Sequence, residues 1–186
     1  ASVSSSAATF APPPRLSETG LYADAATLTV DPRNRPFTPQ YPLWSDGAVK
    51  RLKRLAWGAA SATEVKMPLD GAVGIMSAAP DIEGVVVSLA AWTRAREIYA
   101  VDAAGKAVNT GLQPLGPFDA PADLVTTEVK VTSHDGALVP LSIMHKRSVK
   151  LDGTNPTLLY GYGSYGITEE PGYRAARLAW LERGGV

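Results

Sequence analysis

The chain has 186 residues, with 18 basic and 18 acidic side chains and no cysteine, so its formal net charge at pH 7 is zero. Hydrophobic residues make up 45% of it, enough apolar mass for one ordinary domain or two small ones. The zero net charge gives no indication of nucleic acid or an anionic membrane surface as a partner. The lack of cysteine excludes disulfides and cysteine metal sites. No apolar run approaches the roughly 20 residues that cross a bilayer.

The first 51 residues are expected to contribute little regular structure. Residues 1–14 are rich in Ser and Ala and end in three prolines, which predicts a flexible start and a stiff spacer. Residues 15–51 contain further prolines and few periodic apolar positions, so we expect an irregular segment that follows the surface. The basic run 50–54 overlaps the end of this segment and is interpreted as solvated.

Residues 52–120 predict short β-strands. Residues 84–92 are rich in β-branched side chains, and residues 97–102 alternate before a turn at Ala103-Ala104-Gly105 and a return strand over 106–109. Strands at this spacing are typical of a propeller blade or a sandwich, and they suffice for about one blade and part of another. Such a piece would have open edges that favour self-association.

The second half of the chain predicts a mixture of strands and one helix. The proline-rich residues 111–124 are expected to form a linker between domains. Beyond them we expect strands over 124–132, 137–145 and 156–160, the first two joined by a turn at Asp135-Gly136. The apolar spacing of residues 174–183 predicts a helix that Gly184-Gly185 ends, and Val186 would open the next strand.

The residues best suited to binding or catalysis follow the third of these strands, which we expect to be buried. The loop over residues 161–166 holds three glycines together with Tyr162, Ser164 and Tyr165. Glycines let the backbone turn sharply and let a ligand approach it closely. Loops at the carboxyl ends of strands bind ligands in α/β domains. We therefore take these three side chains as candidate site residues.

Three segments of the chain, residues 131–146, 151–166 and 177–186, resemble the prolyl oligopeptidase family of serine peptidases in order and spacing. They match the start of its α/β-hydrolase domain, whereas residues 90–94 and 111–118 resemble the end of its β-propeller. The resemblance implies a mixed β and α/β fold, with a propeller-like segment over 52–120 and the start of a hydrolase domain over 121–186. It also implies hydrolysis of a peptide or small ester by acyl transfer from a serine, without metal or cofactor.

The same resemblance implies roles for two tyrosines. Tyr162 matches a tyrosine that helps to form the family's oxyanion hole, and Tyr165 falls where an aromatic residue lines its proline-binding pocket. The family's nucleophile, acid and histidine lie beyond the position that matches Val186. We therefore expect the chain to lack the catalytic triad, and whether it is itself an enzyme stays open. The alternative is that both tyrosines pack in the core with their hydroxyl groups satisfied.

Two other functions stay open. A small esterase-like hydrolase would use Ser164 as nucleophile, because residues 162–166 differ by one residue from the G-x-S-x-G pattern. Its base would be His134 or His145, which are otherwise interpreted as a solvated turn residue and a surface residue. A non-catalytic β-rich binding module would instead present its strand edges to a partner.

A second resemblance concerns the front of the chain. Residues 16–22 and 41–47 resemble the opening of a family of secreted bacterial proteins often found with c-type cytochrome domains. No haem attachment motif is possible without cysteine. The two resemblances meet near residues 50–52, which predicts a junction between segments of unrelated origin, either natural or produced by gene assembly. Localisation stays open between the bacterial cytoplasm and the periplasm or secretion.

Overall fold

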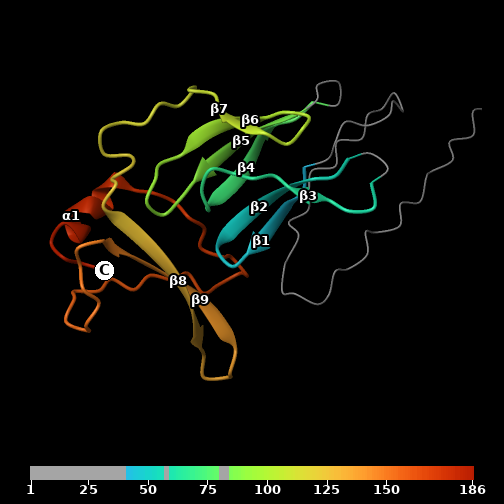
Figure 1. Ribbon diagram of the computed structural model, residues 1–186. Coiled ribbons are helices and arrows are strands. Elements are labelled where there is room, and N and C mark those ends of the chain that lie inside the picture. The colour runs from blue at the N-terminus through green and yellow to red at the C-terminus, as the bar shows by residue number, and fades with distance from the viewer. Residues whose placement is uncertain (1–40, 57–58, 80–83) are drawn as a thin grey trace, which may run out of the picture.

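The computed structural model describes residues 41–56, 59–79 and 84–186, and this part of the chain is mostly β-sheet (Figure 1). The helical residues lie together near its carboxyl end. The elements, in chain order, are β1 (Leu43–Asp46), β2 (Val49–Arg54), β3 (Thr63–Glu64), β4 (Ala72–Ser77), β5 (Val85–Ala90), β6 (Glu97–Val101), β7 (Ala107–Asn109), β8 (Leu124–Thr132), β9 (Leu138–Lys146), the 3-10 turn η1 (Ala175–Arg177) and α1 (Leu178–Leu181).

The first sheet has the order β1-β2-β3 and corrects one prediction. We expected residues 15–51 to be irregular; residues 15–40 lie outside the described residues, but residues 43–51 form most of an antiparallel hairpin. Leu43 pairs with Leu52 and Asp46 with Val49, around a turn in which Gly47 has φ +61. Glycine reaches this φ without steric cost, so the Asp-Gly step closes the hairpin despite the nearby prolines.

The second sheet has the order β4-β5-β6-β7 and confirms the strands expected over 84–92, 97–102 and 106–109. All its neighbouring pairs are antiparallel. Alternate residues of β5 are buried, as expected for a strand with one face against a core. The turn between β6 and β7 is held by the Asp102 side chain, whose Oδ1 accepts 2.9 Å hydrogen bonds from the backbone N–H groups of Ala104 and Lys106. One complete four-stranded unit and part of another are therefore present.

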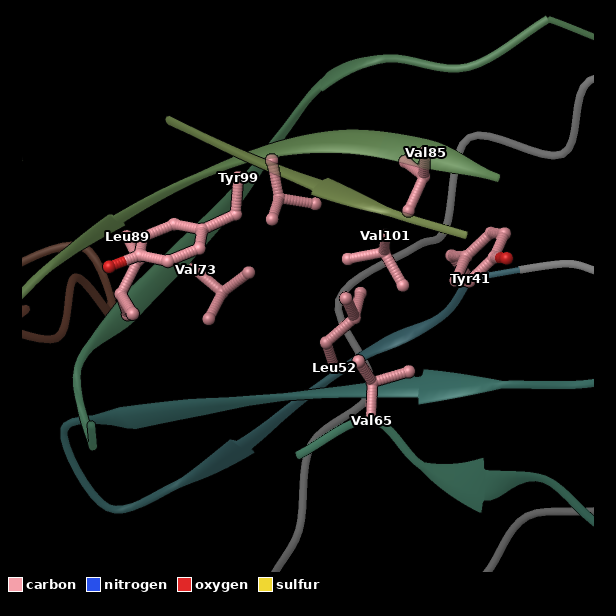
Figure 2. Close-up of a cluster of buried hydrophobic side chains, with 9 residues drawn as sticks. Tyr41, Leu52, Val65, Val73, Val85, Leu89, Tyr99 and Val101 are labelled. Atoms are coloured by element: carbon pink, nitrogen blue, oxygen red, sulfur yellow. The ribbon is translucent and has the colours of Figure 1, made fainter. Parts of the chain in front are cut away.

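The hydrophobic core lies between the two sheets (Figure 2). Leu52 of β2 is fully buried there, and Val87 and Leu89 of β5 are buried in the same cluster. The prediction that the basic run 50–54 is solvated is therefore only partly right, because alternation along β2 turns Leu52, the one apolar residue of the run, inward. Lys53 remains at the surface with its Nζ 4.4 Å from the centroid of the Trp44 ring. The complete cluster contains Tyr41, Leu52, Val65, Val73, Val85, Val87, Leu89, Tyr99 and Val101.

Strands β8 and β9 form a separate antiparallel hairpin, as predicted (Figure 1). The turn contains Gly136 with φ +84, and the Asp135 side chain accepts a 3.1 Å hydrogen bond from the backbone N–H of Ala137. The hairpin extends away from the two-sheet core, so apolar residues such as Val131 and Val139 are about half exposed. Among the described residues, no helix is long and apolar enough to span a membrane.

The strand predicted over residues 156–160 is not formed, and its expected burial is wrong. Leu158 and Leu159 are 72% and 78% exposed. The backbone does make two hydrogen bonds with the last residue: Leu158 N–H donates to Val186 O, and Val186 N–H donates to Pro156 O, both at 2.9 Å. This is the pattern of a parallel pair. A single pairing residue does not cover the run, so its side chains stay in solvent. Val186, which we expected to open the next strand, makes only this contact.

The predicted helix over 174–183 is present as η1 followed by α1, and two glycines end it as expected. Gly184 has φ +80 and donates to Leu181 O at 3.1 Å, while Gly185 donates to Trp180 O at 3.2 Å. These two bonds define a Schellman motif, which satisfies the last carbonyl groups of the helix. The motif turns the chain back so that Val186 reaches residues 156–158.

A polar cluster is buried at the start of β6. Glu97 is only 5% exposed, and its carboxylate accepts hydrogen bonds from Arg94 Nε at 2.5 Å and Asn109 Nδ2 at 2.6 Å. The Arg94 hydrogen bond is the main reason that the pKa of Glu97 lies below its ordinary value, against the opposing effect of burial. Hydrogen bonds from Arg94 and Asn109 therefore keep the buried Glu97 carboxylate ionised.

This cluster predicts an acid-sensitive contribution to stability. Because the folded pKa of Glu97 is below the unfolded one, its stabilisation is present above about pH 4.3 and is lost as the pH falls through the folded pKa. We expect Glu97→Gln to make the free energy of unfolding less dependent on pH between neutral pH and about pH 3. Urea denaturation across that range measures the slope. The exposed Glu182→Gln is the control, and an equal effect of both variants would contradict the prediction.

Candidate functional site

The candidate loop, residues 161–166, follows the parallel contact with Val186 directly and stands open to solvent. Tyr162 is 48% exposed and Tyr165 is 89% exposed. A Cβ added at Gly161, Gly163 or Gly166 would meet no atom within 4 Å. The three candidate side chains predicted from the sequence thus share one accessible turn. The alternative interpretation, that both tyrosines pack in a core, does not describe their surroundings here.

The backbone of the loop has an unusual conformation at Tyr165. Its φ is +54, and it is the one non-glycine residue with a positive φ among those that the structure describes. Gly163 and Gly166 on either side have φ values of +66 and +64. A left-handed conformation costs a non-glycine residue about 1–2 kcal/mol. Such a local cost at an exposed aromatic residue motivates a functional hypothesis for Tyr165.

Ser164 does not form a hydrogen-bonded pair with either histidine. Its hydroxyl makes no side-chain hydrogen bond to the part of the chain that the structure describes, and its backbone carbonyl accepts from Ile167 N–H at 3.1 Å. His134 Nδ1 lies 3.3 Å from Ser133 Oγ, within the β8–β9 turn. His145 Nδ1 lies 2.8 Å from the backbone oxygen of Lys146, on β9. The role of Ser164 as a nucleophile stays a prediction.

One other possible centre lies outside the loop. A cavity of about 250 Å³ lies beside β2 and β3, where residues such as Leu52, Val65 and Asp70 line it. Arg51, at its rim, is close to three carboxylates, with Asp70 Oδ1 nearest at 2.5 Å. In the described ranges, 41–56, 59–79 and 84–186, no group of His, Asp and Glu side chains could hold a metal ion.

Sequence reasoning missed a set of residues that hold the segment after the loop. Glu170 Oε1 lies 2.8 Å from Lys50 Nζ of β2. The Tyr173 hydroxyl donates to the backbone oxygen of Phe118, and burial, with a smaller effect of Asp119, raises the pKa of that phenol. These residues have no periodic pattern, and their partners lie 55 or more positions away in sequence. No local signal identifies such contacts.

Several proteins resemble this chain in sequence. The prolyl endopeptidase of Elizabethkingia meningoseptica is 39% identical over 66 residues, which are 36% of this chain and 9% of that protein. An uncharacterized peptidase of Sinorhizobium fredii is 32% identical over 130 residues, which are 69% of this chain and 18% of that protein. No protein-family model matches the chain.

Solved structures resemble it over a larger part of its length. A prolyl endopeptidase structure, 25% identical, has a TM-score of 0.67 and covers 79% of this chain and 22% of its own. Oligopeptidase B from Trypanosoma brucei, with covalently bound antipain, is 21% identical, has a TM-score of 0.73 and covers 90% of this chain and 24% of its own. The latter likeness concerns the fold alone.

The chain resembles peptidases that combine a β-propeller with an α/β-hydrolase domain, and it contains strands of both. The homologues are prolyl oligopeptidase-like peptidases, and the chain corresponds to a fragment that spans about a fifth of their length. The expected family and mixed fold are thereby confirmed. The resemblance of residues 15–50 to the cytochrome-associated family stays a prediction.

Proposed function

We propose that this chain supplies the oxyanion side of a serine-type peptide hydrolysis site. Tyr162 would donate its hydroxyl hydrogen bond to the oxyanion, and Tyr165 would contact the substrate. The observation that carries the proposal is the parallel contact of residues 156–158 with Val186, immediately before an open glycine-rich turn. Ligands bind beyond the carboxyl ends of parallel strands. The likeness to prolyl endopeptidases supports the same assignment.

The proposed chemistry is acyl transfer. In peptide hydrolysis the carbonyl oxygen becomes negatively charged in the tetrahedral intermediate, and a preorganised donor stabilises that charge. The phenol of Tyr162 is such a donor, and the open backbone around it leaves room for a peptide carbonyl. We assign no nucleophile, base or acid to residues of this chain, and no metal or cofactor takes part in the proposed reaction. The domain boundaries proposed with this function are a propeller-like segment over residues 52–120 and the start of a hydrolase domain over residues 121–186.

A fluorophosphonate probe tests the assignment of the nucleophile. We expect no covalent labelling of Ser164 in the folded chain, because its hydroxyl has no histidine beside it to remove the proton. Mass spectrometry after proteolysis locates any modified residue, and a cooperative melt shows that the sample is folded. Labelling at Ser164 that disappears in Ser164→Ala would instead establish the esterase-like alternative and refute the proposal.

Binding of a short acylated Gly-Pro amide tests the substrate contact. Stacking of a prolyl ring on the exposed face of Tyr165 is expected to contribute about 1 kcal/mol, so Tyr165→Ala should weaken binding about fivefold. Nuclear magnetic resonance titration measures such weak binding. Tyr160→Ala, which removes an exposed tyrosine before the loop, is the matched control and should bind as the parent chain does. Equal losses in both variants would show a nonspecific aromatic contact.

A second proposal concerns self-association, and the exposed apolar face of the β8–β9 hairpin favours it. Val129 pairs with Leu141 and Val131 pairs with Val139 on one face of a two-stranded sheet. Its outer edges pair with no other strand in the part of the chain that the structure describes. Such edges add strands from another chain. We expect concentration-dependent association by sedimentation velocity, reduced by Val131→Lys and unaffected by Thr132→Lys on the opposite face. A monodisperse monomer at all concentrations would exclude it.

A further inference from the structure

The candidate loop makes few contacts of its own, so its position depends on what holds its two ends. Its side chains are exposed, and added Cβ atoms at its glycines would meet empty space. Before the loop, the chain is held by the hydrogen bonds between residues 156–158 and Val186. After the loop comes the segment 168–177, which we call the strap. It has no regular structure before η1, so its side-chain contacts decide where it lies.

The strap contacts the β-rich part of the chain through three of its side chains. Glu170 forms the ion pair with Lys50 of β2, whose side chain is only 16% exposed. Tyr173 donates to the backbone oxygen of Phe118. Arg177 lies with its guanidinium carbon 5.9 Å from the centroid of the Trp92 ring. Three successive parts of the strap thus contact three different parts of the preceding chain.

The strap is also braced internally. Pro171 is buried, and Arg177 Nη1 donates to the backbone oxygen of Gly172 at 3.0 Å. The same guanidinium therefore contacts both Trp92 and the strap backbone, so movement of the strap breaks more than one interaction. A half-buried ion pair is worth more than an exposed one because solvent screens it less. The Lys50–Glu170 contact, which lies nearest the loop, is the member of the set that a charge change can test cleanly.

We propose that the strap is a positioning device that fixes the candidate loop against the β-rich part of the chain. The ion pair between Lys50 and Glu170 keeps the strap in place. Neither residue touches the proposed oxyanion or substrate, so both are positioning residues. The inference concerns where the loop lies, and it holds whether or not Tyr162 acts in catalysis.

The absence of cysteine makes a direct measurement possible. Ser164→Cys and Ala104→Cys together place one nitroxide label in the loop and one in the exposed β6–β7 turn. Pulsed electron paramagnetic resonance then gives the distribution of distances between the two labels in the full chain. We expect a narrow distribution in the otherwise unchanged protein.

Charge reversal tests the ion pair. Lys50→Glu or Glu170→Lys replaces attraction by repulsion, so the population outside the narrow distribution should rise about fivefold. The double variant K50E/E170K restores opposite charges and should restore the narrow distribution. Lys66→Glu and Glu169→Lys make the same charge changes at positions with no ion pair among the described residues and should leave it unchanged.

Two results would overturn the inference. One is an unchanged distribution in both single reversals while thermal melting shows folded protein. The other is a double variant that stays as broad as the single ones, since a general loss of packing is not repaired by exchanging two charges. If a reversal variant does not fold, Glu170→Gln removes the attraction without adding repulsion, and the same broadening is required of it. Loss of peptide binding by Tyr165→Ala is a separate result and does not bear on the strap.

Discussion

Replacing Leu52 by alanine is expected to lower the free energy of unfolding by about 3 kcal/mol. Leu52 is fully buried, and it lies in the cluster between the sheet β1-β2-β3 and the sheet β4-β5-β6-β7 (Figure 2). Truncation removes the transfer free energy of the lost methyl and methylene groups and leaves a cavity that the surrounding valines fill only in part. Urea denaturation followed by circular dichroism measures the change.

Leu151→Ala is the matched control for this prediction. Leu151 is 49% exposed in the loop after β9, so its truncation should change the free energy of unfolding by less than about 1 kcal/mol. Similar losses in the two variants would mean that the two sheets do not share a core. That result would also contradict the single core that joins the β1–β2 hairpin to the second sheet.

Replacing Gly185 by alanine is expected to lower the free energy of unfolding by about 2 kcal/mol. A Cβ at this position would lie 2.3 Å from Trp180 Nε1, a distance that forces the ring or the backbone to move. The indole N–H donates to Val186 O at 3.2 Å, so a displaced ring also loses this bond. Because Val186 holds residues 156–158, the change should reach the start of the candidate loop.

The effect of Gly185→Ala is measured by thermal or urea unfolding together with the indole N–H resonance of Trp180, which should shift. Gly172→Ala is the control, since its added Cβ would meet Glu170 O at an ordinary 3.8 Å. An unshifted Trp180 resonance and unchanged stability in Gly185→Ala would show that the turn has room for a side chain. The role given to the Schellman turn in placing Val186 would then be wrong.

Local patterns in the sequence predicted the elements whose causes are local. The alternation in residues 85–90 and 97–101 reflects one buried face of a strand, and both strands formed where expected. The turn at Asp135-Gly136 and the helix end at Gly184-Gly185 depend on glycines that adopt positive φ values. The candidate loop could also be recognised from the sequence, because its glycines, hydroxyl groups and aromatic rings are neighbours along the chain.

Other features depended on contacts between distant residues, and the sequence did not indicate them. Prolines around residues 32–42 suggested a loop, yet residues 43–54 form strands because the second sheet covers Leu52. Residues 157–160 have the composition of a buried strand but stay exposed, since one pairing residue cannot cover them. Strand-like composition alone does not form or bury a strand, because both require neighbouring elements.

What the sequence by itself determined is therefore the strands of the second sheet after β4, the β8–β9 hairpin and the helix end, together with the residues of the candidate loop and their likeness to prolyl oligopeptidases. These depend on side chains within a few positions of one another. Only the tertiary structure decided which strands share a core and what holds the loop. Lys50 and Glu170 are 120 residues apart, and they meet only because the folded chain places the strap beside β2. A contact between such distant residues leaves no periodic pattern in the sequence, because it depends on how whole elements are arranged.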